Sequence, residues 1–277
     1  MALQLTYLFH DSFIVSSPDC NIIFDFWKRP AEFPAPANGF MDSSPFGEEE
    51  LHKPLYVFVS HFHKDHYNPD IFEWQKVWKE RGGKGNVKYI ISADVCRHAR
   101  HILHHDSIYK GYHPDIESVV VLRKGKKWND ELITVTAYGS TDIGNSYLVT
   151  VDGKNIFHAG DLNAWIWKDE STEEEVIHAL NAYRSELRPI VSENPRLDIA
   201  LFPVDSRIGT DYFTGASILL DKADVGYFIP MHFMLGENEE EQARLSNDAL
   251  RFGAYAPNDG KTVFVGLTAP GDKLLIP

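Results

Sequence analysis

Short apolar runs separated by turn residues fill the first sixty positions of the chain. Some runs alternate apolar and polar side chains and others are continuously apolar, and both patterns are typical of β-strands. The last of these runs leads directly into a group of histidines. We expect strands at residues 3–9, 12–15, 21–26 and 55–60.

Residues 27–50 interrupt this series with four prolines and two glycines. Proline lacks a backbone N–H and fixes φ, so we expect a long irregular loop in place of a helix or strand. Two roles stay open for the loop, a flap over a substrate and a passive surface excursion.

Helical patterns appear between further strand-like runs. Asn68 and Pro69 supply an N-cap and a first helical residue, and Ser171 and Glu174 have the spacing of a capping box. Asp152-Gly153 is typical of a hairpin turn. The expected helices are 69–79, 171–187, 214–222 and 238–252, and the further strands are 118–122, 132–137, 146–151, 155–158, 197–204, 227–230 and 262–267.

Strands and helices therefore occur in two successive halves. This order predicts an α/β fold in which two mixed β-sheets pack together with helices outside, an αββα sandwich. Because no linker-like or low-complexity segment separates the halves, we expect one domain over residues 1–277.

Composition narrows the range of partners. The 277 residues include 27 basic and 40 acidic side chains, a formal net charge of −13, which disfavours nucleic acid as a partner. We find no secretory signal pattern and no apolar run near the length of about 20 residues that spans a bilayer. With only two cysteines, a cytoplasmic protein with no membrane partner is expected.

Candidate chemistry begins where the strand at 55–60 ends. Three imidazoles and a carboxylate lie within six residues, a dense set of ligands for Zn²⁺, with Mn²⁺ and Fe²⁺ as alternatives. In an extended segment His61 and His63 point the same way, while a turn lets Asp65 and His66 face a second position. The segment therefore predicts one or two divalent metal ions.

This H-x-H-x-D-H segment resembles the signature of the metallo-β-lactamase superfamily. Two later segments are similar to the same family: Gly160-Asp161 at the end of a strand, and His232 after Ile229-Pro230-Met231. The resemblance runs through nearly the whole chain and implies a metal-dependent hydrolase. It also implies that His61 and His63 hold one metal, that Asp65, His66 and His232 hold the other, and that Asp161 bridges the two ions.

One ligand of that pattern is absent. The family usually has another histidine before the Gly-Asp strand, where this chain reads Tyr138-Gly139-Ser140-Thr141-Asp142. Either Asp142 supplies a carboxylate in its place, or that metal position is weak or empty.

The remaining histidines are assigned mainly to structural roles. His98, His101, His104 and His105 have no carboxylate in a ligand pattern beside them, so a solvated helix face is favoured. His158 is expected in a supporting or core position. His10 is similar to a histidine near the active-site floor of many family members, and a hydrogen-bonded structural role stays open for it.

Polar and aromatic residues that follow other strands are candidates for the substrate pocket. Asp205 and Arg207 come directly after an apolar run, and an arginine there suits a bidentate contact with a carboxylate or phosphate. An ion pair between these two side chains is the alternative. Trp165 and Trp167 are candidates either to wall the pocket or to anchor their loop in the core.

These observations predict an enzyme that uses a metal-bound hydroxide on a small, anionic ester, lactone or phosphate, with Asp65 and Asp161 as catalytic residues. The layout is similar to the family branch that contains ascorbate-6-phosphate lactonase. Two alternatives stay open: a phosphodiesterase or nuclease, and a metal-binding protein without turnover. The first is opposed by the acidic charge, and the second is favoured by the absent histidine.

Overall fold

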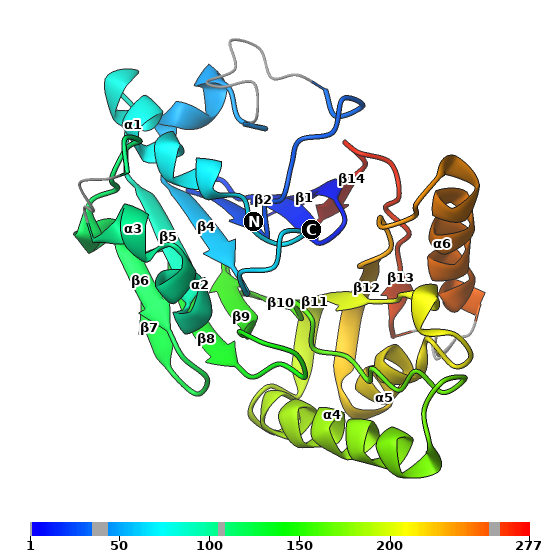
Figure 1. The fold of residues 1–277 in the computed structure, drawn as a ribbon. Helices are drawn as coiled ribbons and strands as arrows, with labels where there is room; N and C mark the ends of the chain where they lie inside the picture. The colour runs from blue at the N-terminus through cyan, green and yellow to red at the C-terminus, as the bar shows by residue number, and fades with distance from the viewer. Residues whose placement is uncertain (1, 35–43, 105–108, 255–260) are drawn as a thin grey trace. The chain divides into compact units, whose positions relative to one another are not determined.

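The computed structural model describes residues 2–34, 44–104, 109–254 and 261–277. The chain divides into two compact units. The first comprises Met1–Arg123 with Ala269–Pro277, and the second comprises Lys124–Thr268. Each unit contains one seven-stranded mixed sheet and its own helices (Figure 1).

The sheet of the first unit has the strand order β14-β1-β2-β3-β4-β5-β6. An antiparallel part, β14 to β3, continues into a parallel part, β3 to β6. Strands β3, β4 and β5 are almost entirely buried, as expected for apolar runs in the middle of a sheet. The strands are β1 (Leu3–Phe9), β2 (Ser12–Ser16), β3 (Asn21–Phe24), β4 (Leu55–Val59), β5 (Val87–Ser92), β6 (Val119–Leu122) and β14 (Lys273–Ile276).

The helices of the first unit connect its parallel strands along the chain. The predicted N-cap is confirmed, because the Asn68 side chain accepts a hydrogen bond from the backbone N–H of Asp70. Trp74 of the helix that follows is fully buried and packs edge-on against Phe26. The helices are η1 (Glu48–His52), η2 (Pro69–Phe72), α1 (Glu73–Glu80), α2 (Ala93–His98), α3 (Arg100–Leu103) and η3 (Ile116–Ser118).

The predicted loop at 27–50 is irregular over residues 27–34 and 44–47, and the short helix η1 then begins at Glu48. Residues 35–43 of this loop lie outside the described residues.

The sheet of the second unit has the strand order β13-β12-β11-β10-β9-β8-β7. Strands β7 to β10 are antiparallel, and β10 to β13 are parallel. The predicted hairpin turn is confirmed, because Asp152 and Gly153 both have positive φ between β9 and β10. The strands are β7 (Lys127–Asn129), β8 (Ile133–Tyr138), β9 (Ser146–Val151), β10 (Lys154–His158), β11 (Arg196–Pro203), β12 (Asp224–Met231) and β13 (Val263–Phe264).

Two helices of the second unit, α4 and α5, lie side by side along its sheet (Figure 1). The capping box of α4 is formed by Thr172 and Glu175, so the predicted pair, Ser171 and Glu174, was wrong by one residue. Both pairs have the required spacing, and the helix begins at Glu173, which puts Thr172 at the cap. The helices are α4 (Glu173–Glu193), η4 (Ser206–Ile208), α5 (Thr214–Lys222), α6 (Glu239–Arg251) and η5 (Phe252–Ala254).

A search of the described helices finds none that combines the length and the apolar character needed to cross a membrane.

Candidate metal centre

In the first unit, the histidine segment begins where β4 ends. His61 is fully buried, and its Nε2 lies 3.0 Å from Nδ1 of His63. The backbone N–H of His66 donates to the carbonyl of His63 at 3.0 Å, which closes a turn. The Asp94 carboxylate, at the start of α2, accepts a hydrogen bond from the backbone N–H of Phe62. The segment is therefore held on both sides of the histidine pair.

Asp25, directly after the neighbouring strand β3, contacts residues at both ends of this segment. Its carboxylate accepts hydrogen bonds from the Ser60 backbone N–H at 2.7 Å and from the Ser60 hydroxyl at 2.5 Å. It also lies 2.9 Å from Nδ1 of His66. A carboxylate at Nδ1 fixes that nitrogen as the N–H donor and leaves Nε2 with its lone pair available to a metal.

Ser60 extends the same arrangement to His61. Its hydroxyl donates to Asp25, so its oxygen accepts from Nδ1 of His61, which lies 3.0 Å away. His61 therefore presents Nε2 as an acceptor, as His66 does. The buried Asp25 and Ser60 thus set the donor nitrogen of two of the three clustered histidines.

A second group in this unit contains His10, Asp65 and His66, whose ligand atoms lie within 4.8 Å of one another. Oδ2 of Asp65 is 3.5 Å from Nε2 of His10 and 3.8 Å from Nε2 of His66. The structure therefore brings the predicted ligands Asp65 and His66 together and adds His10 to them.

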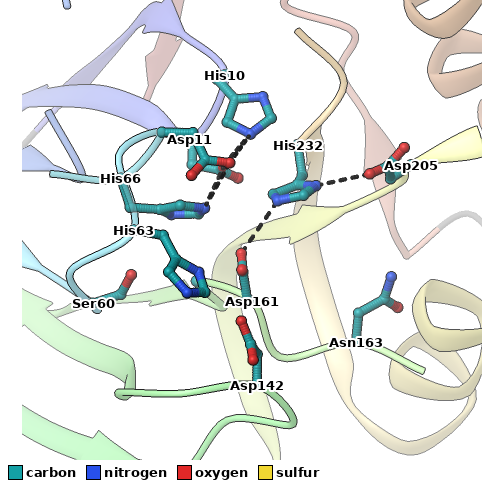
Figure 2. Close-up of polar contacts among 12 residues, drawn as sticks. His10, Asp11, Ser60, His63, His66, Asp142, Asp161, Asn163, Asp205 and His232 are labelled. Carbon is teal, nitrogen blue, oxygen red and sulfur yellow. Dashed lines mark hydrogen bonds and ion pairs between the residues drawn. The ribbon is translucent and has the colours of Figure 1, made fainter. Parts of the chain in front are cut away.

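In the second unit, the predicted ligands Asp161 and His232 lie at the ends of two parallel strands. Asp161 follows β10 through Gly160, which has a φ of 52°, and His232 follows β12 with a φ of 68°. Nε2 of His232 lies 3.3 Å from Oδ1 of Asp161 (Figure 2). Nδ1 of His232 lies 3.0 Å from Oδ2 of Asp205, so a buried carboxylate again fixes the donor nitrogen of an imidazole.

Residues 4–232 match the sequence model of a protein family described as a β-lactamase superfamily domain. The matched region includes every predicted ligand from His61 to His232. The match extends over most of the 277 residues. This chain belongs to the β-lactamase superfamily.

Solved structures of other proteins share the fold of this chain. A novel metallo hydrolase from the archaeon Ignicoccus hospitalis is 16% identical, with a TM-score of 0.58 and 100% and 99% of the two chains covered. The metallo-β-lactamase fold protein YhfI from Bacillus subtilis is 12% identical, with a TM-score of 0.56 and 99% of each chain covered. At these identities the likeness shows the fold alone, and it confirms the predicted fold class of two mixed sheets with helices.

The same fold is found in proteins with other names. The diiron β-hydroxylase CmlA from Streptomyces venezuelae is 11% identical with a TM-score of 0.57, and the likeness covers 99% of this chain and 54% of CmlA.

In sequence, a protein of Mycolicibacterium smegmatis named for a Rieske 2Fe-2S cluster is 35% identical over 72 residues. That match spans 24% of this superfamily member and 13% of its relative.

Asp205 forms the ion pair with Arg207 that the sequence left open. The guanidinium donates from Nε at 3.0 and 3.1 Å and from Nη2 at 2.5 Å to the carboxylate. Burial alone would raise the pKa of Asp205, but the hydrogen bonds and charges of His232 and Arg207 outweigh burial and hold that pKa well below its usual range. The substrate-binding role of this pair stays a prediction.

Trp165 contacts the second-unit ligands. Its indole N–H donates to the backbone carbonyl of Asp161 at 2.8 Å, and its ring centroid lies 5.3 Å from that of His232. Asp142 is exposed, and one of its carboxylate oxygens lies within 4.8 Å of one of Asp161. The structure therefore brings Asp142 to the Asp161 carboxylate. Trp167, by contrast, is 41% exposed.

The other histidines lie where the sequence places them. His98, His101 and His104 are exposed, as expected for a solvated face, and His105 lies outside the described residues. His158 is buried, and its Nδ1 accepts a hydrogen bond from the backbone N–H of Gly160, a supporting contact beside Asp161.

Asp11, Asp25 and Ser60 were not singled out from the sequence. All three are buried polar residues next to the first-unit histidines. A signal for Asp25 was present, because it is a carboxylate directly after the apolar run at 22–24 and before Phe26. A carboxylate in such a run is rarely buried without a specific partner.

Proposed function

We propose that this superfamily member is a metal-dependent hydrolase that acts on a small, anionic ester, lactone or phosphate. One observation supports this most strongly: in each unit a buried carboxylate lies at Nδ1 of a histidine, Asp25 at His66 and Asp205 at His232. This arrangement prepares the opposite nitrogen for a metal and is typical of metal-ligating histidines.

The proposed ligands are the residues that the family resemblance implies. We assign His61 and His63 to one metal, Asp65, His66 and His232 to the other, and Asp161 as the bridging carboxylate. Family membership supports this assignment, because the matched region 4–232 contains all six residues. Asp142 is proposed as the substitute for the absent histidine, since its carboxylate lies near that of Asp161.

The donor atoms fit a divalent metal. Imidazole nitrogens and carboxylate oxygens are the ligands that Zn²⁺ takes in catalytic sites, and Mn²⁺ and Fe²⁺ accept the same mixture. We propose Zn²⁺ as the first choice. The separation of 3.0 Å between ring nitrogens of His61 and His63 is near the spacing of about 3.3 Å between two ligands of one tetrahedral Zn²⁺ ion.

When bound, a divalent metal supplies the Lewis acidity that activates water and polarises the electrophile near neutral pH. The residues of the chain hold the metal and the substrate. Asp65 and Asp161 provide the carboxylates proposed as catalytic, while Asp25 and Asp205 hold His66 and His232 in one tautomer. Arg207, with its side chain 30% exposed, is the proposed anchor for an anionic group of the substrate.

A small substrate is favoured over nucleic acid because the chain carries a net charge of −13. We also propose that the whole chain is one domain. Its low content of two cysteines supports a location in the cytoplasm. The ascorbate-6-phosphate lactonase branch supplies one substrate class for the test, a lactone or ester of a small phosphorylated sugar acid.

Purified protein of measured metal content should be assayed against lactones, phosphodiesters and β-lactams. We expect turnover in the lactone or ester arm that is lost on chelation and restored by added metal. Cleavage of phosphodiesters alone would favour the nuclease alternative. Metal binding without turnover of any class would contradict the proposed enzyme.

A further inference from the structure

The turn between β1 and β2 carries two buried residues that the superfamily signature does not include. His10 and Asp11 are both fully buried, and His10 has a left-handed φ of 56°. The backbone N–H of His10 donates to the hydroxyl of Tyr7 at 2.9 Å, which holds the turn in this conformation. The turn directs the Asp11 carboxylate toward the rings of His10 and His66 (Figure 2).

Asp11 lies at contact distance from both rings. Its Oδ2 is 3.0 Å from Nε2 of His10 and 3.5 Å from Nε2 of His66. Oδ2 of Asp65 lies 3.5 Å from the same His10 nitrogen and 3.8 Å from the same His66 nitrogen. Two nitrogens and two carboxylate oxygens thus lie close together within one unit.

These separations are those expected of ligands around a single ion. Bonds of about 2.1 Å place neighbouring ligand atoms about 3.4 Å apart in a tetrahedral site and about 3.0 Å apart in an octahedral one. The four separations, from 3.0 to 3.8 Å, lie around these values.

The charge balance of the group points the same way. Nδ1 of His66 lies at the Asp25 carboxylate, so its Nε2 is the nitrogen directed at Asp11 and Asp65. An imidazole nitrogen with its lone pair available and two carboxylate oxygens are together the donor types that a divalent cation binds. A divalent ion among these atoms carries the charge opposite to that of the two carboxylates.

We propose that Asp11 and His10 are additional ligands of the metal already assigned to Asp65 and His66, so that the first unit contributes two imidazoles and two carboxylates to it. This inference rests on the proposed function, since it concerns the same metal as Asp65 and His66. An extra carboxylate adds a hard oxygen ligand, which shifts preference toward Mn²⁺ relative to Zn²⁺. Asp11 is therefore a determinant of metal choice as well as of affinity.

Calorimetric titration of the metal-stripped full chain with Mn²⁺ and with Zn²⁺ tests this, using Asp11→Asn and His10→Gln. Asp19→Asn is the matched control, because it removes an exposed carboxylate from the next turn of the same unit. We expect Asp11→Asn to weaken Mn²⁺ binding by more than about 100-fold, Zn²⁺ binding by less, and Asp19→Asn to change neither.

The two proposals fail differently. A wild-type chain that binds no metal overturns the proposed function. If the wild-type chain binds metal and Asp11→Asn binds Mn²⁺ and Zn²⁺ as tightly as the wild type does, only the role of Asp11 is overturned. If Asp11→Asn does not fold, the anomalous-diffraction position of the ion in the wild-type protein decides. A distance of about 2.1 Å to Asp11 Oδ2 supports the proposal, and one beyond about 3 Å overturns it.

Discussion

The two sheets repeat one order of strands, and the candidate chemistry follows equivalent strands in both. In the first unit, the antiparallel strands β1, β2 and β3 are followed by parallel β4, β5 and β6. In the second, β8, β9 and β10 are followed by parallel β11, β12 and β13. Asp25 and Asp161 follow the third strand of their series, and His61 and Asp205 follow the fourth. Polar residues thus gather at the carboxyl ends of parallel strands in each unit.

The two units differ in how their buried carboxylates are held. Asp25 accepts hydrogen bonds from Ser60 and lies at His66, whereas Asp205 lies at His232 and also binds the permanently charged guanidinium of Arg207. The same carboxylate–histidine arrangement therefore exists with an arginine beside the carboxylate in the second unit and with a serine beside it in the first.

Removing a direct ligand from either unit should have the largest effect. His66→Ala and Asp161→Ala should each abolish hydrolysis and remove bound metal, because each takes a ligand from the more complete metal position. Metal content per chain and turnover are the measurements. His101→Ala and His104→Ala are matched controls on an exposed face and should leave both unchanged. Full metal content in His66→Ala would exclude the proposed ligand.

Breaking the ion pair of the second unit should lower stability by about 3 kcal/mol at pH 7, the low end for a buried pair because Arg207 is partly exposed. Arg207→Met leaves the Asp205 carboxylate buried without its guanidinium. Since the folded-state pKa of Asp205 is lowered, the pair contributes fully above the unfolded value of about 4, and that contribution is lost as pH falls below it. Urea unfolding at pH 7 and pH 3.5 should show the difference between wild type and variant shrinking at the lower pH. An equal difference at both would contradict this charge balance.

Asp25→Asn tests the contact between the Asp25 carboxylate and His66 in the first unit. An amide nitrogen beside Nδ1 no longer fixes the tautomer of His66, so metal affinity should fall by about 10–100-fold while the ligands themselves stay in place. Competition with a chelator measures the change. Asp19→Asn serves as the control. Unchanged affinity in Asp25→Asn would show that this carboxylate is only structural.

The smallest effect is expected at Asp142. The position assigned to His61 and His63 should bind metal more weakly than the other, since it lacks one family ligand. Asp142→Ala should lower its affinity and Asp142→His should raise it, each by about tenfold, with the tighter position unaffected. Calorimetry that resolves two classes of site measures this. Two equally tight sites in all three proteins would show that the absent histidine has no consequence.

The sequence predicted the ligand segment and most of the longer strands because both depend on local patterns, but the six-residue strand β5 was missed. The apolar run at 55–60 and the following histidines are contiguous, and β4 was confirmed within one residue. Strand β14 was missed because it is short and pairs with β1 from the far end of the chain. Asp25 was missed because its role depends on the parallel pairing of β3 with β4, which carries Ser60 to its carboxylate.

Other differences arise from choices that local patterns leave open. Thr172 and Ser171 both suit a capping box by residue type, and the start of α4 decides between them. The pairing of Asp205 with Arg207 was one of two open roles, and it is settled by the η4 turn that brings the guanidinium back to the carboxylate.

The most direct test of the metal centre is a titration of the metal-stripped wild-type chain with Zn²⁺, with bound metal counted by mass spectrometry and esterase or lactonase turnover followed in parallel. We predict one tightly bound equivalent, a weaker second one, and turnover that rises with occupancy of the first. Absence of any bound equivalent, with the chain folded, would contradict the assignment of this superfamily member as a metal-dependent hydrolase.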